Sequence, residues 1–291
     1  MGFSSFDDAI NETSNNGKIN RTDFTKTSAV TAGIGRWYDM SLQNGFPIAN
    51  PYTGETTNLK FKALSDLDGM GIWHGGDVSP DTKHLLNIGA FGSTATSAPS
   101  VLQLVDVLGY YPITTVTTTT AQTLNNTVTL PRYADGAGVR AYLVARQTCG
   151  AGTPSITINY TNQAGVSGKV NPVTVTAVTA AAAGHIVHSD PTANHYGCFL
   201  PLANGDNGIR SIQSIQLSAT MTSGSLALVL CRPITALPIV SLGVASERNL
   251  LNQLPSLPRI YDGANLNFLM FTGAAYAAGG NIQGYLEAIW G

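Results

Sequence analysis

The sequence predicts a mainly β protein: an antiparallel β-sandwich of the jelly-roll type, with an irregular N-terminal arm and one or two short helices. Alternating or β-branched segments recur between residues 112 and 232, as is typical of half-buried strands. Stretches rich in Asn and Gly, such as Asn204–Gly208, separate these segments and provide turns. Short strands at this spacing indicate an antiparallel sandwich.

Charged residues are unusually few. Lys and Arg number 15 and Asp and Glu 17, together 11% of the 291 residues, whereas an ordinary soluble domain has about 25%. The hydrophobic content of 43% argues against disorder, and the net charge of −2 excludes a generally basic nucleic-acid binder. No apolar run is long enough to span a membrane. This composition is typical of secreted β-proteins and of subunits that bury much of their surface in an assembly.

We expect the chain to fall into three parts. Residues 1–98 form an N-terminal helix and an irregular assembly arm, residues 99–240 form the β-sandwich domain, and residues 241–291 form a C-terminal β-hairpin on the same or an adjoining sheet. The first residues show no basic segment followed by an apolar one, so we expect no signal peptide.

Two short helices are predicted from capping signals. In the first, Ser5 caps the start, acidic residues at positions 7 and 8 suit the positive end of the helix dipole, and Gly17 ends the helix. The second covers residues 100–108, where Ser100 caps an apolar run that Gly109 ends. Its apolar positions cover more than one face, so we expect it to be at least half buried.

The segment from about residue 20 to 98 shows no sustained periodicity, yet it holds two of the three Trp residues. Long irregular segments are unusual inside compact domains. We therefore expect an assembly arm with Trp37, Tyr38, Trp73 and His74 in its contacts, because large aromatics dominate interface energetics. The alternative is that the segment folds back over its own sandwich.

An eight-residue sequence occurs twice. Leu-Pro-Arg-Tyr-Ala-Asp-Gly-Ala at 130–137 returns as Leu-Pro-Arg-Ile-Tyr-Asp-Gly-Ala at 257–264, and each copy leads into a predicted strand. Proline keeps the approach extended and Asp-Gly supplies a turn. We expect Asp135 and Gly136 to occupy a structural turn equivalent to that of Asp262 and Gly263.

One histidine cluster suggests a metal site. His185, His188 and Asp190, with His195 nearby, could provide zinc ligands if the segment is a loop. In a strand, residues three apart point to opposite faces. The simpler interpretation is a polar loop that follows the alanine-rich residues 180–184.

Other signs of chemistry are weak. Asp66–Gly69 and Asp206–Gly208 resemble fragments of calcium loops, but neither continues to the distal Glu. The three cysteines are too scattered for a disulfide framework or a zinc site, and we interpret them as buried thiols. Phosphate-binding glycine motifs and a nucleophile elbow are missing from the sequence. We therefore expect no catalytic residues, no enzymatic activity, no cofactor and no bound metal.

Four segments resemble structural proteins of tailed bacteriophages: Gly35–Asp39, Gly71–Pro80, Leu108–Pro112 and Asn126–Tyr133. The resemblance extends from about residue 30 to 291, and the family is mostly uncharacterised. It implies a virion component but assigns no functional residues.

We therefore expect a non-enzymatic virion protein, assembled in the bacterial host cytoplasm. The favoured role is a capsid decoration or cement subunit that binds the major capsid protein and copies of itself, without nucleic-acid or membrane partners. A receptor-binding or tail-fibre protein that recognises host carbohydrate is the alternative, and the shell-forming capsid protein is the third. A receptor binder should expose aromatics in loops of the β region, and a shell protein of the common tailed-phage fold should show a long charged helix.

Overall fold

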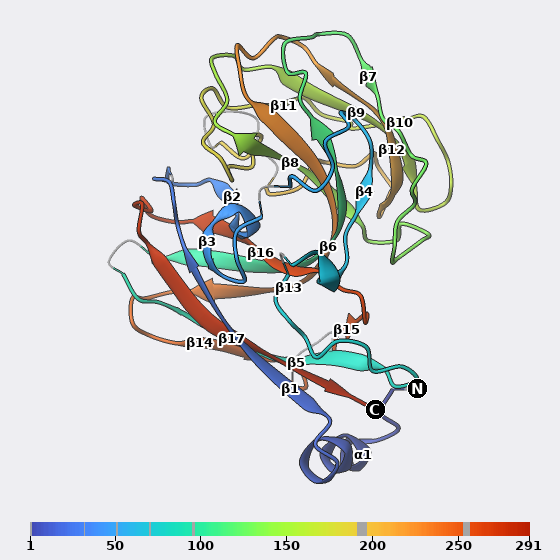
Figure 1. Cartoon of the computed structure of the whole chain (residues 1–291), viewed down its shortest axis with the longest axis vertical. Coiled ribbons are helices and arrows are strands. Elements are labelled where there is room, and N and C mark those ends of the chain that lie inside the picture. Colours follow the sequence, from blue (N-terminus) through green and yellow to red (C-terminus); the bar gives the residue numbers. More distant parts are fainter. Residues whose placement is uncertain are drawn as a thin grey trace.

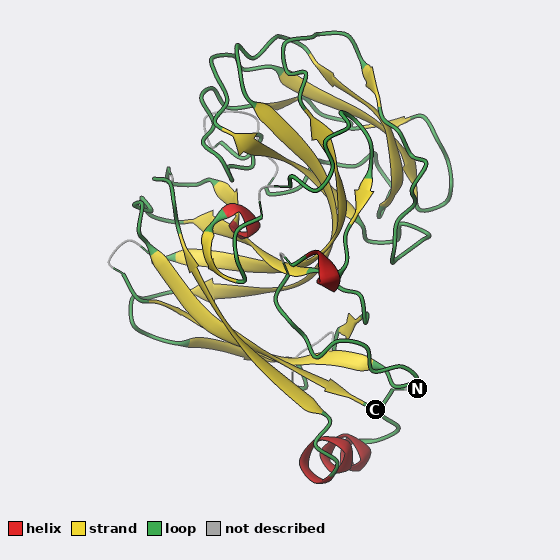
Figure 2. Ribbon diagram, in the orientation of Figure 1, coloured by secondary structure: helices red, strands yellow, loops and turns green. Residues whose placement is uncertain are grey.

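The computed structural model describes residues 2–31, 33–50, 52–69, 71–94, 97–190, 197–252 and 257–291. Strands dominate and are paired antiparallel in three sheets (Figures 1 and 2). The predicted mainly β, sandwich-like fold is confirmed. The helices described are α1 (Phe6–Ile10), the single π-turn η1 (Asn11–Asn15) and two 3₁₀ turns, η2 (Met40–Leu42) and η3 (Asp66–Asp68).

The lower sheet of Figure 1 joins the two ends of the chain. Its strands are, in spatial order, β14 (Ser246–Asn249), β5 (Lys83–Gly92), β17 (Asn281–Trp290), β1 (Ile19–Thr27) and β3 (Asn44–Phe46), and β15 (Arg259–Ile260) also pairs with β5. The register from Ile19 opposite Ile289 to Thr27 opposite Asn281 fixes β1 against β17 along its whole length.

The central sheet extends from the lower part of the molecule to the upper part. Its strands are β2 (Trp37–Asp39), β16 (Leu266–Thr272), β6 (Ser100–Ile113), β13 (Ser225–Ile239) and β8 (Arg140–Gln147), and β4 (Lys62–Ala63) pairs with β6. Strands β6 and β13 run antiparallel from the pair Ile113–Leu226 to the pair Ser100–Ile239. They are the long elements that connect the two halves.

The upper sheet covers the other end of the central sheet. It contains β10 (Lys169–Val170), β9 (Ser155–Asn162), β12 (Ile209–Leu217) and β7 (Gln122–Thr123), and β11 (Val175–Thr176) pairs with β9. Strand β9 alternates buried and less buried residues, as predicted for the alternating segments between residues 112 and 232. The chain therefore forms two sandwiches that share one central sheet.

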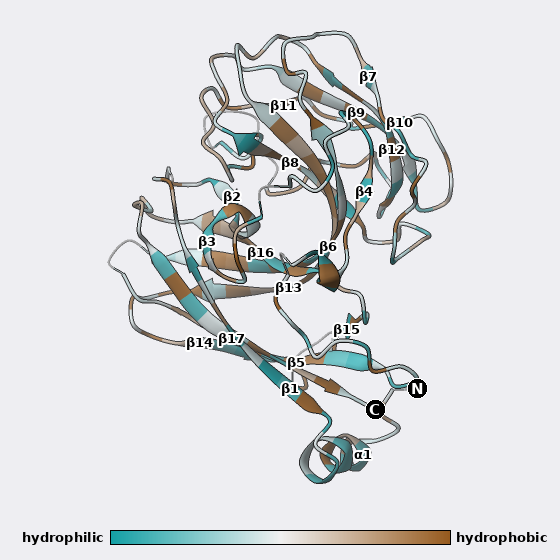
Figure 3. Cartoon of the chain, in the orientation of Figure 1, coloured by the Kyte–Doolittle hydropathy of each residue, from teal (hydrophilic) through white to brown (hydrophobic). Residues whose placement is uncertain are grey.

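Each sandwich encloses its own core. The upper core lies between the central and upper sheets and includes Leu108, Leu228 and Ile158. The lower core lies between the central and lower sheets and includes Leu104 and Leu286. Apolar residues recur along β6, β13 and β17 in Figure 3, as strands that border a core require.

A third core covers the opposite face of the central sheet. It includes Val107, Tyr142 and Val229, and segments around Tyr52 and Ile186 cover it. Because both faces of β6 are buried, apolar residues follow one another along the strand. That pattern predicted a helix over residues 100–108, and the prediction is wrong: this stretch is strand β6.

The predicted division of the chain differs from the structure. Residues 1–98 include β1 and β5, which are inner strands of the lower sheet, so this part is not a separate arm. Its described residues between β3 and β5 are largely irregular and form only β4 and η3. The last two strands do not pair with each other as a hairpin would, because β16 belongs to the central sheet and β17 to the lower one. The first helix is as predicted: the Ser5 side chain accepts a hydrogen bond from the Asp8 backbone N–H at 3.0 Å, and Gly17 follows the helix with φ +67°.

Candidate functional site

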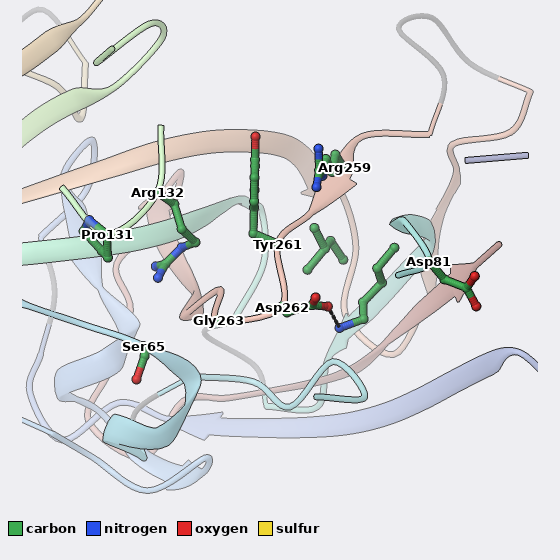
Figure 4. Close-up of a pocket in the computed structure, with 10 residues that line it drawn as sticks. Ser65, Asp81, Pro131, Arg132, Arg259, Tyr261, Asp262 and Gly263 are labelled. Carbon is green, nitrogen blue, oxygen red and sulfur yellow. Dashed lines mark hydrogen bonds and ion pairs between the residues drawn. The ribbon is translucent and has the colours of Figure 1, made fainter. Parts of the chain in front are cut away.

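The two copies of the repeated sequence meet where the two halves of the molecule join. The ring centres of Tyr133 and Tyr261 lie 4.9 Å apart with an interplanar angle of 73°, a favourable edge-to-face geometry. Figure 4 shows residues from both copies around one cavity, with Arg132 from the first and Arg259 and Tyr261 from the second. The repeat therefore builds one site from two distant segments.

The first copy contributes a buried ion pair. Two guanidinium nitrogens of Arg132 donate to the Asp106 carboxylate: Nε to Oδ2 at 2.9 Å and Nη2 to Oδ1 at 2.7 Å. Arg132 also donates to the carbonyls of Leu64 and Val107. The backbone N–H of Asn265, next to the second copy, donates to Asp106 Oδ1 at 2.9 Å. Bidentate pairs of this kind are geometrically specific, so the contact ties both copies to β6.

The position of Asp106 explains its importance. On β6 it lies between Leu104, which belongs to the lower core, and Leu108, which belongs to the upper core. Asp106 is fully buried and Arg132 is 8% exposed. A buried charge left without its partner is strongly destabilising. The pair therefore holds the junction between the two sandwiches.

The second copy leads to a buried lysine. Lys83 Nζ lies 3.3 Å from Asp262 Oδ1 and 3.0 Å from His74 Nδ1, and it also contacts the Gly76 carbonyl. Because an ammonium only donates, His74 Nδ1 accepts, and His74 Nε2–H donates to the Ala264 carbonyl at 2.9 Å. Burial lowers the pKa of His74, and nearby Lys83 lowers it further. Burial also lowers the pKa of Lys83, against the opposing effect of Asp262.

Two cavities share Arg259 and Tyr261 in their linings. The larger, of about 380 Å³, also contacts Arg132, Lys83 and Asp262 (Figure 4). The smaller, of about 270 Å³, is lined by Tyr133, Arg232, Pro233, Ile234 and Pro258 besides Arg259 and Tyr261. Both are open to solvent and together form a cleft at the junction of the two halves.

Two arginines stack on the two tyrosines in this cleft. The Arg259 guanidinium lies 4.3 Å from the ring centre of Tyr261, and that of Arg232 lies 5.5 Å from Tyr133. We call Tyr133, Arg232, Arg259 and Tyr261 the Arg–Tyr cluster. Within the described part of the chain, neither arginine has a carboxylate within 4 Å, in contrast to Arg132. The cluster thus carries two positive charges that no carboxylate neutralises.

The four residues predicted for the assembly arm have separate surroundings. Tyr38 is 3% exposed and stacks on His185 with ring centres 5.0 Å apart, and the Trp37 ring lies 5.4 Å from that of Phe271. His74 is 1% exposed, whereas Trp73 is 48% exposed. Tyr38 and His74 are therefore enclosed within this chain, and Trp73 is the residue of the four that presents a large free surface.

The histidine segment, for which a polar loop was the simpler interpretation and a zinc site the alternative, is buried. His185, His188 and Asp190 are each at most 1% exposed; Asp190 pairs with Arg36, and the Leu143 backbone N–H donates to His188. Burial lowers the pKa of His185 to about 4. The described residues contain no group of three His, Cys, Asp or Glu side chains suited to a metal ion, and His195 lies outside the described residues.

The calcium-like fragments have structural roles. Asp68 forms a capping box with Ser65, and Asp206 accepts hydrogen bonds from Tyr160 and Asn162. The three cysteines are buried and unpaired, as expected: Cys149, Cys198 and Cys231.

The sequence indicated the repeat but not the four residues of the Arg–Tyr cluster. Tyr133, Arg259 and Tyr261 lie within the copies, whereas Arg232 comes from β13, which nothing in the sequence connects with them. The signal that could have found the first three is the repeat itself. The contact between Tyr133 and Arg232 depends on the pairing of β13 with β6.

Comparison with known proteins leaves the family open. No family model matches, and no curated protein matches. Two solved structures of infectious bursal disease virus are similar: one of the Gt strain, at 11% identity with 94% of this chain and 81% of that chain covered, and one of a point mutant of the VP2 protein in derived T=1 particles, at 10% identity with 93% and 77% covered. Both have a TM-score of 0.17, too low to indicate a shared fold. Among the described helices, none is long and apolar enough to cross a membrane.

Proposed function

We propose that the chain is a non-enzymatic structural subunit of a tailed-phage virion, in which it decorates the capsid shell. The observation that carries the proposal is the apolar surface at both edges of the lower sheet. At the β3 edge, Phe46 and Ile48 are 54% and 70% exposed; at the β14 edge, Val240, Leu242 and Val244 are exposed. Leu242 bridges to the end of β5, which places that loop at the sheet margin.

Sheet edges are normally protected in proteins that act alone. Charged side chains, proline or a covering element keep neighbouring molecules from pairing with them. Here Glu247 and Arg248 on β14 and Pro47 after β3 restrict backbone pairing at the two edges, yet large apolar side chains are exposed beside them, in a chain with only 11% charged residues. Apolar surface of this kind marks contact sites between proteins, which supports a role as an assembly subunit.

The distribution of exposed residues favours decoration over the other virion roles. The large apolar residues exposed in the described upper half are aliphatic, whereas the exposed aromatics lie in the first 98 residues: Val128, Val166 and Val170 against Phe6, Phe46 and Trp73. A receptor binder should show the reverse. The longest helical run described, α1 with η1, covers Phe6–Asn15 and is shorter than a shell protein's charged helix.

Counting copies in the purified particle tests the proposal. Quantitative mass spectrometry should find hundreds of copies per particle, and a few tens would overturn decoration in favour of a tail or vertex position. The double variant Phe46→Glu, Ile48→Glu should fold but fail to bind particles that lack the protein. Val166→Glu, an equally exposed position of the upper half, is the matched control and should bind normally.

Carbohydrate recognition is the second candidate, favoured by Trp73. Its indole is 48% exposed and nearly parallel to the His74 ring, with ring centres 6.2 Å apart and an angle of 17°. A rigid, exposed indole offers a flat apolar face beside polar groups, which suits a sugar ring. Binding of the chain to host glycans that Trp73→Ala abolishes would support this candidate; equal binding by both proteins would contradict it.

A further inference from the structure

We propose that the cleft at the junction of the two halves binds an acidic sugar, with the sugar carboxylate on the Arg–Tyr cluster and the sugar hydroxyls in the larger cavity. This inference goes beyond the proposed role in the virion and does not depend on it. It also concerns a different surface from the indole of Trp73, which lines neither cavity.

The Arg–Tyr cluster offers hydrogen-bond donors that the fold leaves largely unused. Within the described part of the chain the Arg259 guanidinium forms no hydrogen bond, and Arg232 donates only from Nη1, to the Ala137 carbonyl. The hydroxyls of Tyr133 and Tyr261 likewise have no hydrogen-bond partner among the described residues. The cluster lines the cavity of about 270 Å³, which no described carboxylate lines. Such a cavity favours an anion, and a guanidinium binds a carboxylate through two parallel hydrogen bonds.

Another arginine stacked on a tyrosine shows the contrast. Arg21 lies 3.9 Å from the ring centre of Tyr285 on the lower sheet. Its guanidinium pairs with the carboxylates of Asp23 at 3.4 Å and Glu287 at 3.5 Å. A stack of the same kind is thus neutralised on the lower sheet and not in the cleft, where a negatively charged ligand would supply the missing partner.

The larger cavity provides acceptors for hydroxyl groups. It shares Arg259 and Tyr261 with the smaller cavity, and these two side chains lie side by side in Figure 4. Its lining adds the hydroxyl of Ser65 and the carboxylate of Asp81. Asp81 uses Oδ2 for Lys18 at 2.8 Å, and its Oδ1 has no hydrogen bond to a described residue. Donors for a carboxylate at one end and acceptors for hydroxyls at the other match an acidic sugar.

The lining of the cleft favours a saccharide over a protein segment. Protein interfaces have a well-packed apolar centre, but none of the large apolar side chains exposed among the described residues lines either cavity. Pro233, Ile234 and Pro258 give the smaller cavity a modest apolar wall, which suits the C–H groups of a sugar ring. Two adjoining cavities of about 380 and 270 Å³ are also of the size of small-molecule sites.

Calorimetric titration with a matched pair of sugars tests the site. Methyl glucuronide carries a carboxylate where methyl glucoside carries a hydroxymethyl group. The wild-type chain should bind the glucuronide at least about 10-fold more tightly, because hydrogen bonds to charged groups are the strong ones. Arg259→Gln should remove this preference. Arg259→Lys keeps the charge but loses the planar guanidinium, so it should restore only part of the preference.

Arg21→Gln is the matched control, because it removes an arginine that also lies over a tyrosine but is already paired; it should keep the wild-type preference. Circular dichroism and melting temperature should show that all variants fold. Equal affinity of the wild type for the two sugars overturns the proposal, and so does an unchanged preference in Arg259→Gln.

Two further probes distinguish an acidic sugar from other anions. Inorganic phosphate should bind more weakly than the glucuronide, because it brings no hydroxyl groups on a ring to the larger cavity. A tetraglutamate peptide should also bind more weakly. Phosphate that binds as tightly as the glucuronide indicates a general anion site, and tighter binding of the peptide indicates a protein partner; either result overturns the sugar assignment.

The outcome is distinguishable from failure of the proposed function. If the chain prefers the glucuronide through Arg259 but is missing from purified particles, the virion role fails and the sugar site stands. If the protein is abundant in particles and does not distinguish the two sugars, the sugar site fails and the virion role stands.

Discussion

The first copy of the repeat, residues 130–137, contacts the start of β12 in the upper sheet, whereas the second, residues 257–264, joins the lower sheet through β15. Arg132 of the first copy is buried against Asp106, while Arg259, at the same place in the second, is exposed over a tyrosine. Nearly identical sequences thus serve opposite purposes. Their surroundings, rather than their own residues, determine which arginine holds the fold and which faces solvent.

The turns of the two copies also differ. Gly136 has φ +75°, whereas Gly263 is not in the left-handed region. Asp135 accepts a hydrogen bond from the Ala137 backbone N–H within its own turn. Asp262 instead accepts from the Val78 backbone and from Lys83, both far away in sequence. The expected equivalence of the two Asp-Gly turns therefore does not hold for backbone or for contacts.

The largest expected effect separates the two arginines. Arg132→Met should destabilise the chain by about 3–5 kcal/mol, because it leaves Asp106 charged and unpaired between the two cores. Arg259→Met should change the free energy of unfolding by about 0.5 kcal/mol or less, as at exposed positions. Urea denaturation of both variants measures the difference. Equal losses would show that the two copies do not differ as the structure indicates.

A smaller difference is expected between the two glycines. A Cβ added at Gly136 would lie 2.5 Å from backbone atoms of Ile209, and its positive φ is unfavourable for alanine. Gly136→Ala should therefore cost about 1–3 kcal/mol. At Gly263 the nearest atom, of the Arg132 side chain, is 3.8 Å away, so Gly263→Ala should lie within about 0.5 kcal/mol of wild type. Thermal melts with equal shifts would contradict this.

The smallest expected effect concerns pH. The second copy is held by neutral His74, whose pKa is lowered in the folded chain by burial. In the unfolded chain His74 takes up a proton at its ordinary pKa of about 6.5, whereas in the folded chain it stays neutral to a lower pH. The free energy of unfolding should therefore fall as the pH drops below about 6.5. The His74→Gln variant should lack this contribution. Its free energy of unfolding should therefore fall less steeply with decreasing pH than that of the wild type.

The matched comparison is again with the first copy. An Arg132→Lys variant should keep the wild-type acid dependence between pH 6.5 and 5, because it leaves His74 unchanged. Denaturant midpoints measured across this range provide the test. Parallel pH profiles for wild type and His74→Gln would show that His74 does not couple the second copy to pH.

The sequence predicted several elements well because the patterns that mark them are local. The strand after each copy is confirmed, as β8 and β16. By contrast, β1 and β5 were missed. Their inward positions include Lys26 and Lys83, which are 2% and 1% exposed, so the apolar alternation that marks a strand is interrupted. The candidate site was missed in part for the same reason, since Lys83 and Arg232 reach it through strand pairing alone.

The sequence by itself determined the β class, the capped first helix and the turns, because alternation, capping and glycine conformations act within a few residues. The tertiary structure alone decided that residues 100–108 are a strand. A continuous apolar run is expected both for a strand buried on both faces and for a buried helix, so periodicity does not distinguish the two. It also decided that Lys26 can be buried. Carbonyls of Gln43 and Pro47 accept from its ammonium, and burial lowers its pKa to about 8. The meeting of the two repeats, 127 residues apart, depends on β6 and β13 as shared long strands, which no local pattern encodes.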